Sequence, residues 1–263
     1  MTQLVLSLFP GIGMLDMAFE EEGFCVVRGP DLLWGGDIRR FHPPAMKFDG
    51  VIGGPPCQAF SRLRHIVEAN GYTPAPDLIP EFERCVLEAQ PEWFLMENVE
   101  AAPIPRVKIY YTSACVIRDT WVGGETNRLR RFTLGRLMPG VRFTLGQLTP
   151  GGAPFEIDTL ALHRADPERA VLARGGGRSV PVAVGGSGKV KRTARGALKN
   201  LAVRSRAAFR DACRLQGLPA DFDLPALTIK ARLNAVGNGV PLAMGRAVAR
   251  AVRRATQVTE QGP

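Results

Sequence analysis

The chain has 263 residues, of which 45% are hydrophobic and 22% charged, a balance that favours a folded protein over a disordered one. Lys and Arg outnumber Asp and Glu by 34 to 25, and the resulting net charge of +9 favours a polyanionic partner. No run approaches the roughly 18 apolar residues of a membrane span and the first residues lack the basic segment of a signal peptide, so we expect a cytoplasmic protein that binds no membrane.

The cysteine and histidine content argues against a metal site. The five cysteines form no CxxC pair, and the chain has only three histidines, so neither a structural zinc site nor a disulfide framework is expected. The 29 glycines and 21 prolines count against an all-helical bundle. One cysteine, Cys57, stands in an unusual local sequence that is described below.

The first half of the chain alternates strand-like and helix-like segments. Residues 4–9 form a nearly continuous apolar run, as expected for a strand that is covered on both faces. Residues 14–22 have the apolar periodicity of a helix that stops at Gly23. Further strands are predicted at residues 25–27, 49–53 and 93–96, and a helix at residues 78–89. This order is typical of an α/β fold with a doubly wound, Rossmann-like sheet.

The alternation stops after about residue 135. The sequence RFTLG at residues 131–135 recurs at residues 142–146. Two copies are too few for a repeat architecture, so we interpret them as adjacent strands of a small β-rich insert.

A basic stretch follows the repeat. Residues 169–210 contain no Asp or Glu and are rich in glycine and basic side chains. The stretch is either a solvated linker or a surface that contacts phosphates, with glycines that let the backbone lie close to a nucleic acid. Helical periodicity returns at residues 209–215 and, after Pro241, at residues 242–252.

The turn after the first strand is one candidate for ligand binding. Its sequence is FPGIG at residues 9–13, and glycine lets a backbone turn sharply and bring its N–H groups close to a ligand. A plain tight turn explains these residues equally well. The third glycine of the dinucleotide fingerprint is missing, which counts against NAD.

A more informative motif, GGPPCQAFS at residues 53–61, follows the predicted strand at residues 49–53. Ligands bind at the carboxyl ends of strands in open α/β sheets, and two glycines with two prolines fix a backbone that presents the thiol of Cys57 to a cleft. A buried structural cysteine needs no such sequence. Glu97 follows the predicted strand at residues 93–96, so we expect its carboxylate to face the same cleft.

Together, these motifs resemble those of the DNA cytosine carbon-5 methyltransferases. The matching segments, in the family's order, are FPGIG at 9–13, PPCQAFS at 55–61, MENV at 96–99, RLR at 128–130, RDACRLQGLP at 210–219 and GNGVP at 237–241. The resemblance implies a catalytic domain that binds S-adenosylmethionine, at residues 1–135 and 206–263. It also implies a small, basic target-recognition region at residues 136–205.

The resemblance implies covalent chemistry on a cytosine that is flipped out of double-stranded DNA. Cys57 would add to carbon-6 of the ring, which makes carbon-5 nucleophilic toward the methyl group of S-adenosylmethionine. Glu97 would hydrogen-bond N3 and the exocyclic amine, which requires that the carboxyl group be protonated or share a proton with the base. Arg128 and Arg130 would orient the cytosine carbonyl and the neighbouring phosphate.

The resemblance also assigns binding residues. Those for S-adenosylmethionine are Phe9, Gly11, Ile12, Gly13, Asp31, Asp37, Pro56 and Asn238, with Asp31 on the ribose hydroxyls and Asp37 on the adenine amine. Those for DNA are Gln58, Ser61, Lys189, Lys191, Arg192 and Arg195. No metal is required, because protein groups perform both activation steps, and we expect a monomer.

Three functions stay open from the sequence. The first is a bacterial or phage DNA (cytosine-5-)-methyltransferase, as found in restriction–modification. The second keeps the chemistry but acts on tRNA, as one branch of the family does. The third is a non-catalytic nucleic-acid-binding relative, which is motivated by Pro30 and by Thr126-Asn127, where the sequence departs from the family pattern.

Overall fold

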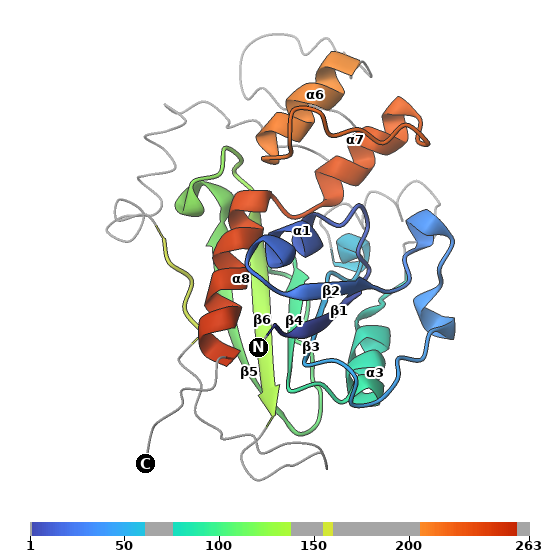
Figure 1. The fold of residues 1–263 in the computed structure, drawn as a ribbon, viewed down its shortest axis with the longest axis vertical. Coiled ribbons are helices and arrows are strands. Elements are labelled where there is room, and N and C mark those ends of the chain that lie inside the picture. Colours follow the sequence, from blue (N-terminus) through green and yellow to red (C-terminus); the bar gives the residue numbers. More distant parts are fainter. Residues whose placement is uncertain (1, 61–75, 138–154, 160–205, 257–263) are drawn as a thin grey trace.

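The molecule is built on one mixed β-sheet (Figure 1). The computed structural model describes residues 2–60, 76–137, 155–159 and 206–256. The sheet has six strands in the order β2-β1-β3-β4-β6-β5. Their bounds are β1 Leu4–Leu8, β2 Cys25–Arg28, β3 Gly50–Gly53, β4 Trp93–Asn98, β5 Tyr110–Arg118 and β6 Leu129–Leu137. The first four strands are parallel, and β6 runs antiparallel to both β4 and β5. The predicted α/β fold with a Rossmann-like parallel sheet is therefore confirmed.

Helices cover both faces of this sheet. Helices α1 (Met14–Glu21) and α8 (Leu242–Thr256) pack on one face, whereas α3 (Ile79–Ala89) packs on the other. Helices α6 (Arg206–Leu215) and α7 (Ile229–Asn238) lie beyond one end of the sheet (Figure 1). No helix among the residues that the structure describes is both long and apolar enough to span a membrane.

Strand residues alternate between two hydrophobic cores, because successive side chains of a strand point to opposite faces. Val5 and Leu95 belong to the core under α1 and α8, whereas their neighbours Leu6 and Phe94 belong to the core under α3. All four side chains are at most 1% exposed. The continuous apolar runs of the parallel strands thus reflect burial on both faces, as the sequence predicts.

The interpretation of residues 131–135 as part of an insert is wrong. They lie inside β6, where Arg131 pairs with Asn98 and Arg136 pairs with Trp93 on β4. A side chain at Gly135 would overlap the ring of Phe94, so the strand passes closely over that ring. The second copy, at residues 142–146, lies outside the described residues, as does most of the predicted region 136–205.

Candidate active site

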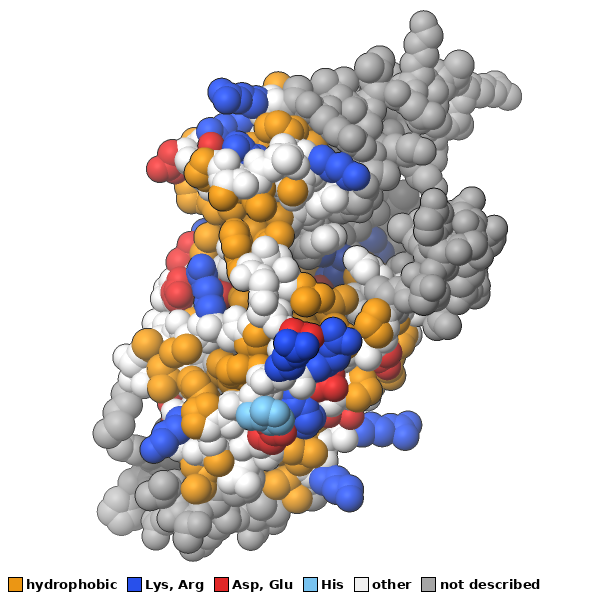
Figure 2. All heavy atoms as spheres, turned by 90° about the vertical axis from the view of Figure 1, so that its right-hand side faces the viewer, with side chains coloured by type: hydrophobic (Ala, Val, Ile, Leu, Met, Phe, Trp, Pro, Cys, Tyr) orange, Lys and Arg blue, Asp and Glu red, His pale blue; other side chains and the backbone are white. Residues whose placement is uncertain are grey.

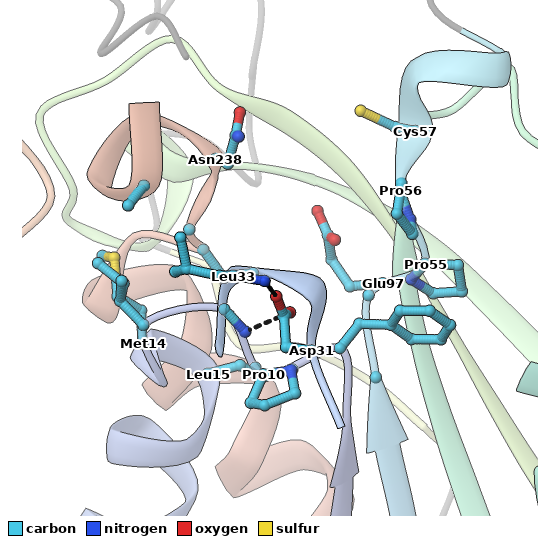
Figure 3. Close-up of a pocket in the computed structure, with 18 of the residues that line it drawn as sticks. Pro10, Met14, Leu15, Asp31, Leu33, Pro55, Pro56, Cys57, Glu97 and Asn238 are labelled. Atoms are coloured by element: carbon cyan, nitrogen blue, oxygen red, sulfur yellow. Dashed lines mark hydrogen bonds between the residues drawn. The ribbon is translucent and has the colours of Figure 1, made fainter. Parts of the chain in front are cut away.

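A pocket of about 420 Å³ opens where the parallel strands β1, β3 and β4 end (Figure 3). This volume is within the usual range for small-molecule sites. Its wall comes from the glycine turn after β1, the loop after β3, the end of β4, strand β6 and the end of α7. Among the predicted residues, it is lined by Cys57, Glu97, Arg128, Arg130, Gln58, Phe9, Gly11, Ile12, Asp31, Pro56 and Asn238.

The glycine turn has the left-handed backbone that its composition predicts. Gly11 and Gly13 have φ values of 55° and 79°, a region that residues with a Cβ rarely adopt. Phe9 shares this region at φ 56°, and such strained backbone in residues other than glycine clusters at functional sites. Gly13 does not line the pocket. It precedes α1 and lies under the guanidinium of Arg28, which a Cβ at Gly13 would approach to 2.6 Å.

The loop after β2 holds the Gly11 peptide group from two sides. Asp31 accepts the Gly11 N–H at 2.8 Å and the Leu33 N–H at 2.7 Å (Figure 3). The indole N–H of Trp34 donates to the Gly11 carbonyl at 2.6 Å. Asp31 therefore lies at the pocket, as predicted, but both of its carboxylate oxygens already accept backbone hydrogen bonds.

The contact of Asp37 with the adenine amine stays a prediction. Asp37 is not among the residues that line the pocket. Its carboxylate accepts the Arg39 N–H at 3.0 Å and forms an ion pair with the Arg39 guanidinium at 2.8 Å. These hydrogen bonds hold the pKa of Asp37 below its usual value. An adenine contact from Asp37 would have to be made beside this ion pair with Arg39.

The loop after β3 is held by the buried side-chain amide of Asn98. Cys57 is half-buried and begins the short helical turn Cys57–Ala59, with Pro55 and Pro56 just before it. The side-chain amide of Asn98 donates to the Pro55 carbonyl at 3.1 Å. Asn98 is 1% exposed, and its Oδ1 accepts the Val99 N–H at 2.8 Å. The sequence reasoning gave Asn98 no role, although it directly follows Glu97 in the MENV motif.

Glu97 ends the apolar run of β4 and is 9% exposed. Arg130 on β6 places its Nε 2.8 Å from Oε1 of Glu97 in an ion pair. The other oxygen, Oε2, would lie 2.9 Å from a Cβ at Gly54, so the loop backbone passes close to this carboxylate. Figure 3 shows the Cys57 sulfur and the Glu97 carboxylate pointing into the same space. The pocket thus brings together a thiol, a carboxyl group and a cation.

Arg128 has a different environment from Arg130, although the two were predicted to act together. Its Nη1 donates to the Gly237 carbonyl at 2.6 Å, and its Nη2 donates to the Asn238 carbonyl at 2.9 Å. The residue is only 8% exposed, and burial lowers its pKa to about 10. Its terminal nitrogens are therefore engaged by backbone, whereas Arg130 engages the carboxylate of Glu97.

A polar network that the sequence did not reveal is centred on the buried Asp16, near the glycine turn. Ser7 donates from Oγ to Oδ1 of Asp16 at 2.5 Å, and Arg28 places its Nε 3.0 Å from Oδ2. Asp16 is completely buried, and burial raises its pKa. Because Asp16 is in the first turn of α1, the network joins this helix to β1 and β2, and Ser7 and Asp16 also line the pocket.

Of the predicted DNA-contacting residues, Gln58 is the one within the described residues. Gln58 is exposed at the pocket. The others, Ser61, Lys189, Lys191, Arg192 and Arg195, lie outside the described residues. The face in Figure 2 mixes charges of both signs, and on α3 the basic Arg84 pairs with Glu81 and Glu88. Within the described ranges, no three His, Cys, Asp or Glu side chains are grouped as a metal ion would need.

Comparison with known proteins gives consistent matches. The family model for the C-5 cytosine-specific DNA methylases matches residues 34–105. The Type II methyltransferase M.NgoPII of Neisseria gonorrhoeae is 34% identical over 116 residues, which are 36% of this chain and 33% of that protein. The Type II methyltransferase M.HgiGI of Herpetosiphon aurantiacus is 31% identical over 123 residues, which are 39% of this chain and 94% of that protein.

A solved structure agrees in fold. The Dnmt2 methyltransferase of S. pombe superposes with a TM-score of 0.55 at 15% identity and covers 98% of this chain and 100% of its own. The match to M.HgiGI extends over nearly the whole of that relative, whereas the chain spans only about a third of M.NgoPII. On these matches, the chain belongs to the family of C-5 cytosine-specific DNA methylases.

Proposed function

We propose that this protein transfers a methyl group from S-adenosylmethionine to carbon-5 of a cytosine in double-stranded DNA. The observation that carries the proposal is the shared pocket of Cys57 and Glu97, which come from the ends of two neighbouring strands. A nucleophilic thiol and a carboxyl group on one small pocket are what addition to a pyrimidine ring demands. Membership of the family supports the choice of cytosine in DNA.

The residues of the pocket fit S-adenosylmethionine. Apolar side chains of Phe9, Ile12 and Pro56 can flank an adenine ring, and Asp31 and Asn238 offer polar atoms in the same pocket. The amino terminus of α1, whose first N–H groups have no partner within the helix, favours the negatively charged end of a ligand. When bound, this cofactor supplies a methyl group on a positively charged sulfur.

In the first step, the thiolate of Cys57 forms a bond to carbon-6 of the cytosine. The electron pair of the carbon-5–carbon-6 double bond moves into the ring and toward N3. Glu97 shares a proton with N3 and limits the charge that develops there. Because Arg130 pairs with Oε1, we assign Oε2 of Glu97 to the base.

In the second step, carbon-5 would use this electron pair to take the methyl group that bound S-adenosylmethionine would supply, and the electrons of the broken methyl–sulfur bond would stay on the cofactor's sulfur. A base then removes the proton from carbon-5. The carbon-6–sulfur bond breaks at the same time, which restores the ring double bond and returns Cys57 as a thiolate. The net change replaces one ring hydrogen by methyl and releases one proton.

An assay with labelled S-adenosylmethionine tests the proposal on duplex DNA and on tRNA in parallel. We expect label in DNA with the natural chain and none with Cys57→Ala. Duplex DNA that contains 5-fluorocytosine should trap the natural chain covalently, because the carbon-5 fluorine cannot leave as a proton. Label in tRNA alone would overturn the choice of DNA. DNA binding without label or adduct would indicate a non-catalytic relative.

A further inference from the structure

We propose that Arg128 is a positioning residue that holds the carboxyl end of α7 against the cofactor pocket, and that it sets the affinity for S-adenosylmethionine without touching the cytosine. This inference rests on the proposed function, because it names the cofactor of that same site. It assigns different tasks to Arg128, which directly precedes β6, and Arg130, which lies in β6, although the motif RLR presents them as a pair.

The end of α7 needs partners from outside the helix. The last four carbonyl groups of an α-helix have no N–H partner within it, and leaving them buried without one is costly. Arg128 donates to the last two, those of Gly237 and Asn238, at 2.6 and 2.9 Å. A cation at this end also interacts favourably with the helix dipole. The guanidinium of Arg128 therefore holds the final turn of α7 in position.

The two preceding carbonyl groups are satisfied elsewhere. The N–H of Gly239 lies 3.2 Å from the carbonyl oxygens of both Ala235 and Val236, and the buried amide of Gln216 donates to Val236 at 2.8 Å. Gln216 directly follows α6, whereas Arg128 reaches this end of α7 from the residue just before β6. Arg128 thus ties the start of β6 to the end of α7 through two hydrogen bonds.

The tethered segment forms part of the pocket wall. Asn238, Gly239 and Val240 all line the pocket, and Figure 3 shows Asn238 across it from Cys57 and Glu97. A Cβ at Gly239 would overlap the side chain of Met14, so the segment is held tightly against α1 on its other side. A shift of the α7 end would therefore change the shape of the pocket directly.

The geometry of Arg128 disfavours a direct role on the cytosine. Both Nη atoms donate to backbone, and the third nitrogen, Nε, is buried without a hydrogen bond. Because both Nη atoms bond the α7 carbonyl groups, a movement of the guanidinium toward a substrate would stretch those bonds. Arg130, in contrast, already pairs with Glu97, the group that faces the base in the proposed reaction.

The experiment compares Arg128→Lys and Arg128→Met with the natural full chain. Calorimetric titration with S-adenosylhomocysteine, a product that cannot react, measures cofactor affinity. We expect affinity to fall about tenfold or more in Arg128→Met, which leaves two carbonyl groups without a donor. Arg128→Lys keeps the charge but cannot bridge both carbonyl groups, so its loss should be intermediate. In kinetics, KM for S-adenosylmethionine should rise more than kcat falls, with KM for DNA unchanged.

Val248→Ala is the matched control for a loss of stability alone. Val248 is completely buried in α8 and does not line the pocket, so its truncation should lower the melting temperature while leaving cofactor affinity unchanged. If both Arg128 variants lose stability but keep the natural affinity, the inference is wrong. A fall in kcat with unchanged KM for the cofactor would also overturn it, in favour of a substrate contact. If the natural chain itself binds no S-adenosylhomocysteine, the proposed function fails first.

Discussion

The side-chain amide of Asn98 donates to the carbonyl oxygen of Pro55 at 3.1 Å, and this bond joins the end of β4 to the loop that carries Cys57. Glu97 directly precedes Asn98, so one hydrogen bond fixes the position of the proposed nucleophile relative to the proposed acid. Because Asn98 is 1% exposed, water offers no ready substitute for it. The position of Cys57 relative to Glu97 thus depends on the Asn98 amide and on the loop backbone, as well as on the two reactive residues.

Replacing Asn98 should therefore impair the chemical step. In Asn98→Ala, the Pro55 carbonyl loses its donor and the loop gains freedom, so we expect kcat to fall about tenfold to hundredfold. Affinity for S-adenosylhomocysteine should change less than about threefold, because the glycine turn is untouched. Steady-state kinetics and titration measure the two effects. Asn98→Asp, which keeps the size but removes the donor, should behave like the alanine variant, and natural turnover in both would contradict the role.

Removal of the carboxyl group of Glu97 should leave the cofactor bound but the cytosine unactivated. We expect Glu97→Ala to lower kcat by about a thousandfold, within the range for loss of a general acid. Cofactor affinity should stay close to natural, because the proposed partner of Glu97 is the base. Titration and methyl-transfer rates give the comparison. If affinity drops as far as the rate, Glu97 acts on the pocket as a whole and its assigned role is wrong.

Gly54 offers a steric test of the same carboxylate. Gly54 is not among the glycines with positive φ, so alanine is compatible with its backbone. The new Cβ would lie 2.9 Å from Oε2 of Glu97 and must displace it. We expect Gly54→Ala to lower turnover about tenfold, with less effect on folding than on rate. Thermal unfolding beside kinetics separates the two, and an unchanged rate would show that the carboxylate adapts without cost.

The buried carboxyl group of Asp16 should make stability depend on pH. Burial raises its pKa, so the folded protein favours the protonated form more than the unfolded chain does. Its contribution to stability is then complete below the ordinary pKa of an aspartate and is lost as pH rises through the raised value. Asp16→Asn lacks this titration. Urea unfolding from pH 4 to pH 8 should show the natural chain losing stability relative to the variant as pH rises, and parallel curves would refute the expectation.

Local patterns predicted the parallel part of the sheet and the position of the pocket. Each predicted strand is an apolar run, and each reactive motif directly follows such a run, so the motifs had to meet at one edge of the sheet. Cys57 and Glu97 were located in this way. Strand β5 was missed, because its sequence YYTSACVIR is exposed over much of its length and has no continuous apolar run. The RFTLG repeat also led to the wrong interpretation of residues 131–135, which belong to β6, as part of an insert.

The roles of partners far apart in the sequence could not be predicted. Arg128 bonds to Gly237 and Asn238, more than a hundred residues away, and no local pattern in either segment indicates this contact. Asp16 was predicted on a helix, where a carboxylate is usually solvated, yet the packing of α1 buries it completely. Asp37 forms an ion pair with Arg39, and the spacing of these residues in the sequence did not indicate this contact.

The hydrogen bond between Trp34 and Gly11 gives the molecule an optical reporter. The chain has three tryptophans, and Trp34 is 56% exposed while its indole N–H bonds to a residue of the pocket wall. Trp93, in contrast, is buried in the core beneath α1 and α8. A molecule that enters beside Gly11 alters the surroundings of one emitting ring, so the intrinsic fluorescence of the unlabelled chain can follow occupancy in real time.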